Sequence, residues 1–256
     1  MTLDNTNTLA GCRALGVDLS GQHLALVGCG GIGFEVARIC AALGARLSIF
    51  DRQLPPAARQ GELASAGIHT WTALDLQGSE AQQSTLQACH DADALIITSA
   101  ICPDESTLDI DSEAWDDSFS TVFSVNLAAP MRLSLGVLQV MKARGKGRIV
   151  LVGSMAGRNG GLLAGPQYAA SKGALHTFVR WLALRAAPHG VSVNGVAPGV
   201  TATPMIEGRK FDASRIPAGR AAEPHEIARV ISFMASPASS YMHGQVLDVN
   251  GGAWIG

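Results

Sequence analysis

Seven short apolar segments, each separated from the next by a longer stretch, constrain the fold of this 256-residue chain more than any other feature. Several of these segments, such as DALIITSA (93–100) and GRIVLVGS (147–154), contain continuous runs of Val, Ile and Leu. Strands of this kind are buried on both faces, which is typical of a parallel sheet with helices on each side. The predicted strands are 24–28, 45–51, 68–75, 93–100, 147–154, 191–197 and 245–249.

The intervening segments have the length and the apolar periodicity of helices. The predicted helices are 32–43, 57–66, 79–90, 112–144, 167–188 and 224–236. Alternating strands and helices predict an α/β fold, a Rossmann-type doubly wound parallel sheet of about seven strands. We expect a single domain over 1–256, with an N-terminal extension at 1–20 and a substrate lid at 204–222. Such sheets bind ligands beyond the carboxyl ends of their strands.

Charge and composition narrow the functional classes. The formal net charge of −2 provides no basic surface for a nucleic-acid backbone. No uninterrupted apolar run reaches the ~18 residues of a membrane span, and the N-terminus lacks the basic-then-apolar order of a signal peptide. The five cysteines and seven histidines are scattered without C-x-x-C or H-x-x-x-H pairs. We therefore expect a cytoplasmic protein with a small-molecule substrate, no metal site, and no nucleic-acid or membrane partner.

The segment LALVGCGGIG (24–33) places a glycine-rich turn between the first strand and the first helix. Gly28, Gly30 and Gly33 fit the pattern G-x-G-x-x-G, with Ile32 before the last glycine. Backbone N–H groups and the helix dipole favour an anion there, and glycine lets the backbone approach a pyrophosphate closely. The alternative is a tight strand-to-helix turn without a ligand. The position of the turn favours a dinucleotide.

Acidic residues follow the second and third strands. Asp51 comes 18 residues after Gly33, where a carboxylate can accept hydrogen bonds from an adenosine ribose and repel a 2′-phosphate. This favours NAD as the cofactor, and the neighbouring Arg52 tempers the preference without reversing it. Asp75 could contact the adenine edge or cap the next turn.

A tyrosine and a lysine one helical turn apart indicate proton-transfer chemistry. Tyr168 and Lys172, in QYAASKGAL (167–175), project from one face of a predicted helix. An ammonium near a phenol stabilises the phenolate, so Lys172 is expected to lower the pKa of Tyr168. This spacing is common in helices without function, but two polar residues accompany it here. Ser154 ends the fifth strand and could bond a substrate oxygen, and Asn126 interrupts an apolar helical segment, where an amide needs a partner.

These features occur in the same order in the short-chain dehydrogenase/reductase family, which the chain resembles over residues 20–252. The resemblance also rests on VAPGVTATP (196–204), which follows the sixth strand, and on VLDVNGG (246–252) near the end. It implies an NAD(H)-dependent oxidoreductase that interconverts a secondary alcohol and a ketone. Hydride would move between the substrate carbon and the nicotinamide, and the protein would supply the alignment.

The resemblance also implies a role for each residue. Tyr168 would be the general acid/base, Ser154 would orient the substrate, and Lys172 would tune the phenol and bind the nicotinamide ribose. Asn126 would hold a water of the proton relay. Further cofactor contacts would come from Ala100, Pro198, Gly199 and Thr203, the last of these at the nicotinamide carboxamide.

Four departures from the family pattern are visible. The glycine turn is one residue shorter and follows Val27, so it lacks the leading hydroxyl. TSAI (98–101) keeps only Ala100 of the family's Asn-Asn-Ala-Gly, so the sequence does not predict the family's polar tie between that strand and the cofactor turn. The serine-to-tyrosine separation is one residue longer, and Asn250 replaces an Asp.

Three other functions share parts of this pattern. A cofactor-binding sensor or structural subunit could keep the fold without turnover, but the set of Asn126, Ser154, Tyr168 and Lys172 argues against it. An epimerase or dehydratase commonly needs a larger C-terminal substrate domain. A methyltransferase could use the glycine turn but would not need the tyrosine and the lysine.

The substrate side of the cleft is expected to be mostly apolar, which favours a compact hydrophobic ketone or secondary alcohol. The residues expected there are Ile101, Met155, Leu162, Leu163 and Met205. Three basic residues of the lid could receive an anionic substrate group or form a solvated face, namely Arg209, Lys210 and Arg215.

The segments 112–144 and 167–188 carry more apolar positions than one sheet face can cover. Such positions include Met131, Leu135, Leu138, Phe178 and Leu182. The equivalent helices form a subunit interface in the family, so we expect a homotetramer. The alternative is that these positions belong to the core of one subunit.

Overall fold

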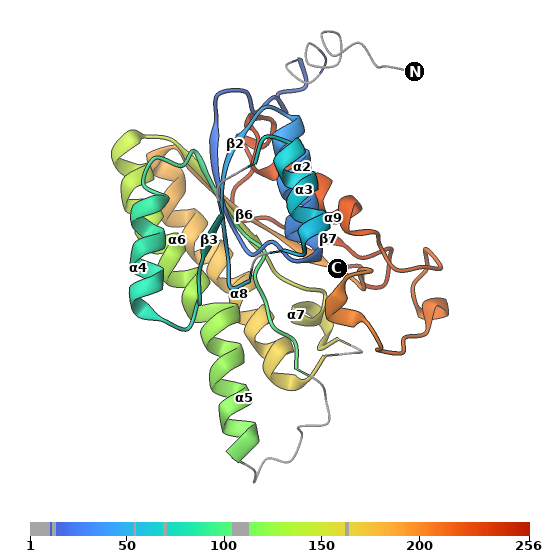
Figure 1. The fold of residues 1–256 in the computed structure, drawn as a ribbon. Coiled ribbons are helices and arrows are strands. Elements are labelled where there is room, and N and C mark those ends of the chain that lie inside the picture. The colour runs from blue at the N-terminus through green and yellow to red at the C-terminus, as the bar shows by residue number, and fades with distance from the viewer. Residues whose placement is uncertain (1–10, 12–13, 54, 69–70, 104–112, 162–163) are drawn as a thin grey trace.

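The computed structural model describes residues 11, 14–53, 55–68, 71–103, 113–161 and 164–256 (Figure 1). Its centre is a seven-stranded sheet in the order β3-β2-β1-β4-β5-β6-β7, with every neighbouring pair parallel. The strands are β1 His23–Val27, β2 Arg46–Asp51, β3 Trp71–Ala73, β4 Ala94–Ile97, β5 Gly147–Val152, β6 Val191–Pro198 and β7 Val246–Val249. The predicted doubly wound sheet is confirmed, although β3 and β4 are shorter than predicted.

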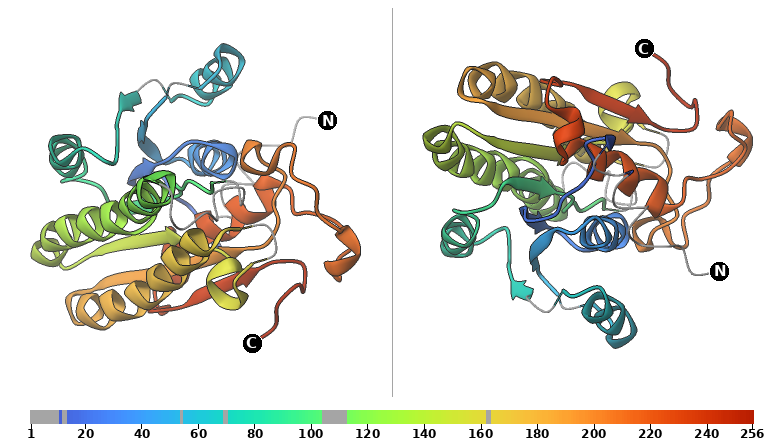
Figure 2. Two further views of the ribbon diagram at one scale, coloured as in Figure 1. Left: turned by 90° about the horizontal axis from the view of Figure 1, so that it is seen from below. Right: turned by 90° about the horizontal axis from the view of Figure 1, so that it is seen from above.

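Helices cover both faces of the sheet (Figure 2). Alternate residues of β1 show why: Ala25 and Val27 belong to one core cluster, and Leu24 and Leu26 belong to the other. One face carries α4 Ser79–Ala88, α6 Ala129–Arg144 and α8 Pro166–Ala186, and the other carries α2 Gly31–Ala42, α3 Ala57–Ser65 and α9 Pro224–Met234. Within the described residues, the other helical segments are α5 Glu113–Phe123, a π-helical turn Ser124–Ala128, α7 Ala156–Asn159 and short 3₁₀ turns at Ala187–His189, Pro204–Ile206, Ala213–Arg215 and Pro237–Ser239.

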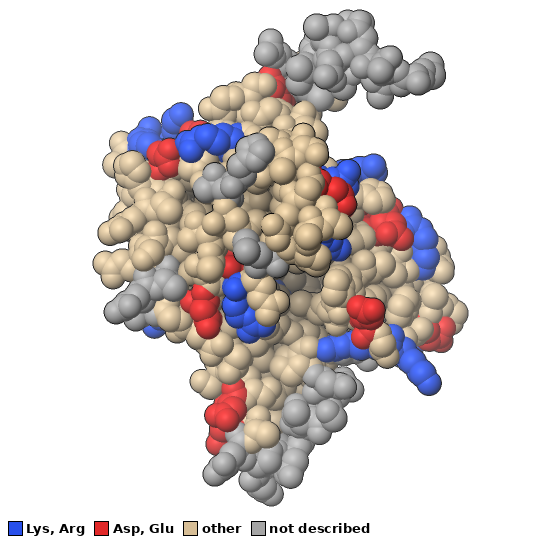
Figure 3. All heavy atoms as spheres, in the orientation of Figure 1, with Lys and Arg blue, Asp and Glu red and all other residues tan. Residues whose placement is uncertain are grey.

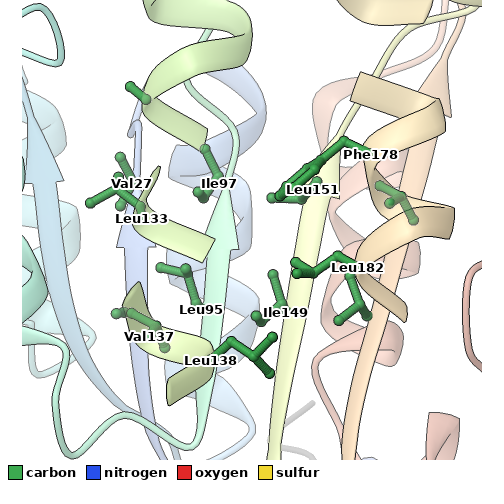
Figure 4. Close-up of a cluster of buried hydrophobic side chains, with 14 of the residues drawn as sticks. Val27, Leu95, Ile97, Leu133, Val137, Leu138, Ile149, Leu151, Phe178 and Leu182 are labelled. Atoms are coloured by element: carbon green, nitrogen blue, oxygen red, sulfur yellow. The ribbon is translucent and has the colours of Figure 1, made fainter. Parts of the chain in front are cut away.

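The larger core cluster lies between β1, β4 and β5 and the helices α6 and α8 (Figure 4). Leu138, Phe178 and Leu182 belong to it and are 2%, 5% and 0% exposed. Their assignment to a subunit interface is therefore wrong, because one subunit buries them against its own sheet. Met131 and Leu135 are partly buried against the same cluster.

The predicted helix 112–144 is interrupted by a π-helical turn. The residues Ser124–Ala128 are π-helical and join α5 to α6. Pro130 lies in the first turn of α6 and has no N–H to donate to the carbonyl of Asn126. Because proline has no N–H, the regular hydrogen-bond pattern of the helix is broken at this point. Single π-helical turns within α-helices are frequent at functional sites.

The helical stretch Ala114–Arg144 is long and apolar enough, by length and composition alone, to cross a membrane. Half of its most apolar window is buried inside the fold, as in the core helix of a globular domain. Polar residues are spaced along this stretch, so it contains no uninterrupted apolar run of the length that a membrane span needs.

The segment predicted as a lid, 204–222, leaves the sheet after β6 and appears in orange in Figure 1. A bridge between Thr201 and Ala222 closes its base. That this segment moves remains a prediction. On the face drawn in Figure 3, Lys and Arg are interspersed with Asp and Glu over a mostly uncharged surface.

Candidate active site

Two adjoining pockets lie at the carboxyl ends of the strands. The first is lined by predicted cofactor residues: Gly28, Gly30, Ile32, Gly33, Asp51, Asp75 and Ala100. The second is lined by predicted catalytic and loop residues: Ser154, Tyr168, Lys172, Pro198, Gly199 and Thr203. Both pockets share Ile32, Thr98, Ala100, Thr203 and Met205, so they form one continuous cleft.

Three glycines of the turn are required by packing within the chain. Gly28 has φ +92°, and a Cβ there would lie 2.4 Å from the backbone N of Ser99. At Gly33 a Cβ would lie 2.2 Å from the carbonyl O of Gly28, and at Gly31 it would lie 2.5 Å from Cγ2 of Thr203. A side chain at any of these positions would displace the turn from the strand, from the helix or from Thr203.

Gly30 has a different reason to be glycine. A Cβ at Gly30 would meet no protein atom within 4 Å, and the residue lines the first pocket. Gly30 is also the N-cap of α2, and no side chain in the described part of the chain caps this helix. The N–H groups of the first turn therefore remain available to an anion. Space beside Gly30 and an uncapped helix start fit the pyrophosphate of a dinucleotide.

A direct hydrogen bond joins the shortened turn to Asp51. The backbone N–H of Cys29 donates to Oδ2 of Asp51 at 2.6 Å, and that of Gln53 donates to Oδ1 at 3.1 Å. A carboxylate has about four acceptor positions, so two remain for ribose hydroxyls. Asp51 therefore braces the glycine turn and still offers acceptors to the pocket. Asp75 also lines this pocket, and its Oδ1 accepts from the N–H of Gln77, as a cap would.

The segment TSAI restores a contact that its sequence does not predict. The hydroxyl of Thr98 donates to the carbonyl O of Gly28 at 2.6 Å. This bond ties the segment after β4 to the glycine turn, which is the polar tie that the sequence did not predict. The relevant signal is a hydroxyl at the first residue after the strand, where the side chain faces the turn.

Lys172 is buried beneath the second pocket. Its Nζ donates to the carbonyl O of Val152 at 2.7 Å and lies 5.7 Å from the ring centroid of Tyr168. Burial lowers the pKa of Lys172 to about 8. Burial also raises the pKa of Tyr168 to about 12, while a hydrogen bond to Ser154 acts in the opposite direction. The expected lowering of the Tyr168 pKa is therefore not found in the free protein, because burial outweighs the opposing contributions.

Asn126 is placed differently from the other predicted catalytic residues. It is fully buried and lines neither pocket. Its Oδ1 accepts from the N–H of Ile101 at 2.9 Å, and its Nδ2 donates to the carbonyl O of Ile101 and to Oγ of Ser171. The buried amide thus has the partners that its position requires. The side chain braces the segment after β4 against α8, and the relay-water role that the resemblance implies for Asn126 remains a prediction.

The loop between Ser154 and Tyr168, which is one residue longer than in the family, contains two glycines with positive φ. Gly160 and Gly161 have φ of +84° and +74°, a conformation that other residues rarely adopt. Asn250, which replaces an Asp, accepts from the N–H of Gly252 and donates to the carbonyl O of Trp254. It therefore holds the turn after β7.

The substrate side of the cleft differs in part from the prediction. Met155 and Met205 line the second pocket as expected, but Ile101 lines the first pocket instead. The positions Leu162 and Leu163 lie outside the described residues. The second pocket is also lined by residues that no sequence pattern indicated, namely Cys102, Ala156, Gly161, Ala164, Val200 and Ile206.

Arg209 joins the segment 204–222 to this wall. Its guanidinium donates to Sγ of Cys102 at 3.3 Å and to the carbonyl O of Cys102. Arg209 also lines the second pocket, whereas Lys210 and Arg215 line a separate hollow that shares Met155 and Val200 with it.

Comparison with known proteins agrees with this geometry. A family model described as enoyl-(acyl carrier protein) reductase matches residues 28–253. Galactitol 2-dehydrogenase (L-tagatose-forming) of Cereibacter sphaeroides is 36% identical over 91% of this chain and 95% of its own. The 3-oxoacyl-(acyl-carrier-protein) reductase FabG of Vibrio cholerae is 36% identical over 72% of this chain and 77% of its own.

A solved structure extends the agreement to three dimensions. It is described as an NAD(P)-dependent gluconate 5-dehydrogenase from Beutenbergia cavernae with bound NADP, and it superposes with a TM-score of 0.83 at 32% identity. The match covers 93% of this chain and 98% of that one. The glycine turn, the parallel sheet and the paired tyrosine and lysine thus occur within a shared fold. The chain belongs to the short-chain dehydrogenase/reductase family of oxidoreductases.

Proposed function

We propose that this protein interconverts a secondary alcohol and a ketone with NAD(H), on a compact and mostly apolar substrate. The observation that carries the proposal is the shared pocket of Ser154, Tyr168 and Lys172, which is continuous with the pocket of the glycine turn. A phenol, a hydroxyl and a buried ammonium at the edge of a dinucleotide cleft are the groups that carbonyl reduction needs.

The side chains divide the proton chemistry between them. In reduction, Ser154 donates a hydrogen bond to the substrate carbonyl oxygen and Tyr168 transfers its phenolic proton to that oxygen. A pKa of about 12 keeps Tyr168 protonated beforehand, as a general acid requires. Lys172 stabilises the phenolate that results. A bound nicotinamide supplies the hydride in this direction and accepts it in the other.

The apolar wall of the second pocket supports the proposed substrate class. Met155, Ala156, Ala164, Val200 and Ile206 contribute it, all within the pocket of Tyr168. Such a wall favours alicyclic or aromatic alcohols and ketones over polyols. A panel of these compounds, assayed in both directions with both cofactors, tests the proposal.

We expect a preference for NAD(H) over NADP(H). Asp51 would face the additional phosphate of NADP(H), and repulsion together with a lost ribose contact amounts to ~2 kcal/mol, or roughly thirtyfold in affinity. Arg52 lines the same pocket and opposes this effect. Comparison of kcat/KM for the two cofactors is the measurement. Equal or better efficiency with NADP(H) would show that Arg52 outweighs Asp51.

We also propose a homotetramer, now supported by residues other than those first expected. Trp181 and Leu184 on α8 are 43% and 77% exposed, and Phe119 on the adjoining α5 is 43% exposed. Large apolar side chains on neighbouring helices are typical of a subunit interface.

Light scattering is expected to give about four times the chain mass of 26.5 kDa. The variant Leu184→Glu should reduce this mass because it places a charge in the interface. Leu15→Glu, which changes a 75% exposed residue outside these helices, should not. A monomer mass for the wild type at micromolar concentration would reject the assembly.

We also propose a cytoplasmic location, a small-molecule substrate, and no nucleic-acid or membrane partner.

The alternative function is a cofactor-binding sensor or structural subunit. The observation that favours it is the shortened turn, in which the N–H of Cys29 is bonded to Asp51 and is not free for a phosphate. Turnover with any alcohol decides between the two.

A further inference from the structure

A buried histidine continues the row formed by Tyr168 and Lys172. His176 follows Lys172 by four residues on α8, so the three side chains share one helix face. It is 3% exposed, and its Nε2 lies 3.3 Å from the backbone N of Ser154. A backbone N–H can only donate, so Nε2 is the acceptor and the imidazole is neutral, with its proton on Nδ1.

The backbone around Ser154 explains what this contact does. The N–H of Gly153 donates to Val196 and that of Met155 donates to Pro198, both on β6. The N–H of Ser154 lies between these two and is directed to His176. Lys172 meanwhile donates to the carbonyl O of Val152. Two successive turns of α8 therefore hold the end of β5 and the segment after it that carries Ser154.

Two glycines make room for the imidazole. A Cβ at Gly153 would lie 2.1 Å from Nε2 of His176, and a Cβ at Gly157 would lie 2.9 Å from its Cε1. In addition, Nδ1 of His176 has no hydrogen-bond partner among the described residues. A buried donor without a partner is unfavourable. Packing alone would be better served by an apolar side chain.

We propose that His176 is a positioning residue, which fixes Ser154 relative to Tyr168 and the substrate oxygen by accepting the Ser154 N–H. This inference rests on the proposed function for its catalytic consequence. Burial, followed by the charges of Arg158, Lys172 and Arg180, lowers the pKa of His176 to about 4. The imidazole is therefore neutral at any working pH above about 5, as an acceptor must be.

Two substitutions separate positioning from packing. His176→Gln keeps an acceptor of similar reach, whereas His176→Leu keeps similar volume without an acceptor. We expect kcat to fall about tenfold in His176→Leu, which corresponds to one hydrogen bond, and to recover by at least half in His176→Gln. Cofactor affinity should be unchanged in both variants, because His176 does not line the first pocket. Equal kcat in the two variants would overturn the proposal, whatever their thermal stability.

A second readout does not depend on turnover. In the ¹⁵N spectrum of the wild type, the resonances absent from His176→Gln identify His176. We expect an unprotonated Nε2 and a protonated Nδ1 that persist unchanged down to pH 5. The opposite tautomer, or titration near pH 6.5, would overturn the proposal. If no substrate is turned over at all, the proposed function fails, but the spectrum still decides whether His176 holds Ser154.

Discussion

We expect the Tyr168→Phe variant to lose turnover by about 10²- to 10⁴-fold, the usual contribution of a positioned general acid. The change removes only the phenolic oxygen. The ring can keep its place above the buried Lys172, whose Nζ is held by Val152 as well. The fold and the affinity for NAD(H) should therefore be retained, since Tyr168 does not line the first pocket.

The chain offers a matched control for this variant. It contains two tyrosines, and the second, Tyr241, is 98% exposed. Tyr241→Phe should keep full turnover, measured by absorbance of the reduced nicotinamide with the best alcohol or ketone of the panel. Near-normal turnover in Tyr168→Phe would end the proposed mechanism, because no other phenol lies in the described cleft.

We expect Gly30→Val to abolish detectable cofactor binding while the protein remains folded. A side chain at Gly30 would meet no protein atom and would instead project into the space of the first pocket. The backbone at Gly30 has φ −69° and ψ −148°, which lies outside the main regions for a residue with a Cβ, so the circular dichroism spectrum of the variant must match that of the wild type. In the folded variant the side chain should exclude a pyrophosphate from the N-terminus of α2.

Calorimetric titration of NAD into this variant is the measurement. Gly61→Val is the control, because a Cβ there also meets no protein atom and Gly61 lies on α3, away from both pockets. The control should bind as the wild type does. Wild-type affinity in Gly30→Val would place the pyrophosphate somewhere other than the glycine turn.

The sheet could be predicted from the sequence because buried parallel strands leave a strong signal. Uninterrupted apolar runs such as those of β1 and β5 need no tertiary knowledge to be recognised. The π-helical turn at Ser124–Ala128 could not be predicted, because Pro130 and Asn126 stand in a pattern that otherwise reads as one helix. The apolar periodicity of the sequence therefore predicted that this segment is helical, but it did not predict the π-helical turn within it.

The burial of the outer helices also depended on tertiary packing. Leu138, Phe178 and Leu182 appeared to exceed what one sheet face could cover, but α6 and α8 contact each other as well as the sheet. Mutual contact between helices buries area that a sheet alone would not. The apolar residues left exposed, such as Leu184, were not distinguishable by composition.

In the cleft, residues at strand ends were predictable and their partners were not. Asp51 and Ser154 follow from where the second and fifth strands end, and the pair on α8 follows from its spacing of one helical turn. The bonds from Cys29 to Asp51 and from Thr98 to Gly28 join segments far apart in sequence. The raised pKa of Tyr168 likewise depends on how deeply the ring is buried, which the spacing of Tyr168 and Lys172 does not reveal.

The central claim is that this chain moves hydride between a substrate carbon and a nicotinamide. The direct measurement is to incubate the protein with NAD⁺ and a panel of secondary alcohols that carry deuterium on the carbinol carbon. The expected result is deuterium at C4 of the reduced nicotinamide, with loss of the label when Tyr168 is replaced by Phe. If calorimetry shows the cofactor bound, yet no alcohol labels NAD⁺ or NADP⁺, the protein is a cofactor-binding sensor or structural subunit and the enzymatic proposal is wrong.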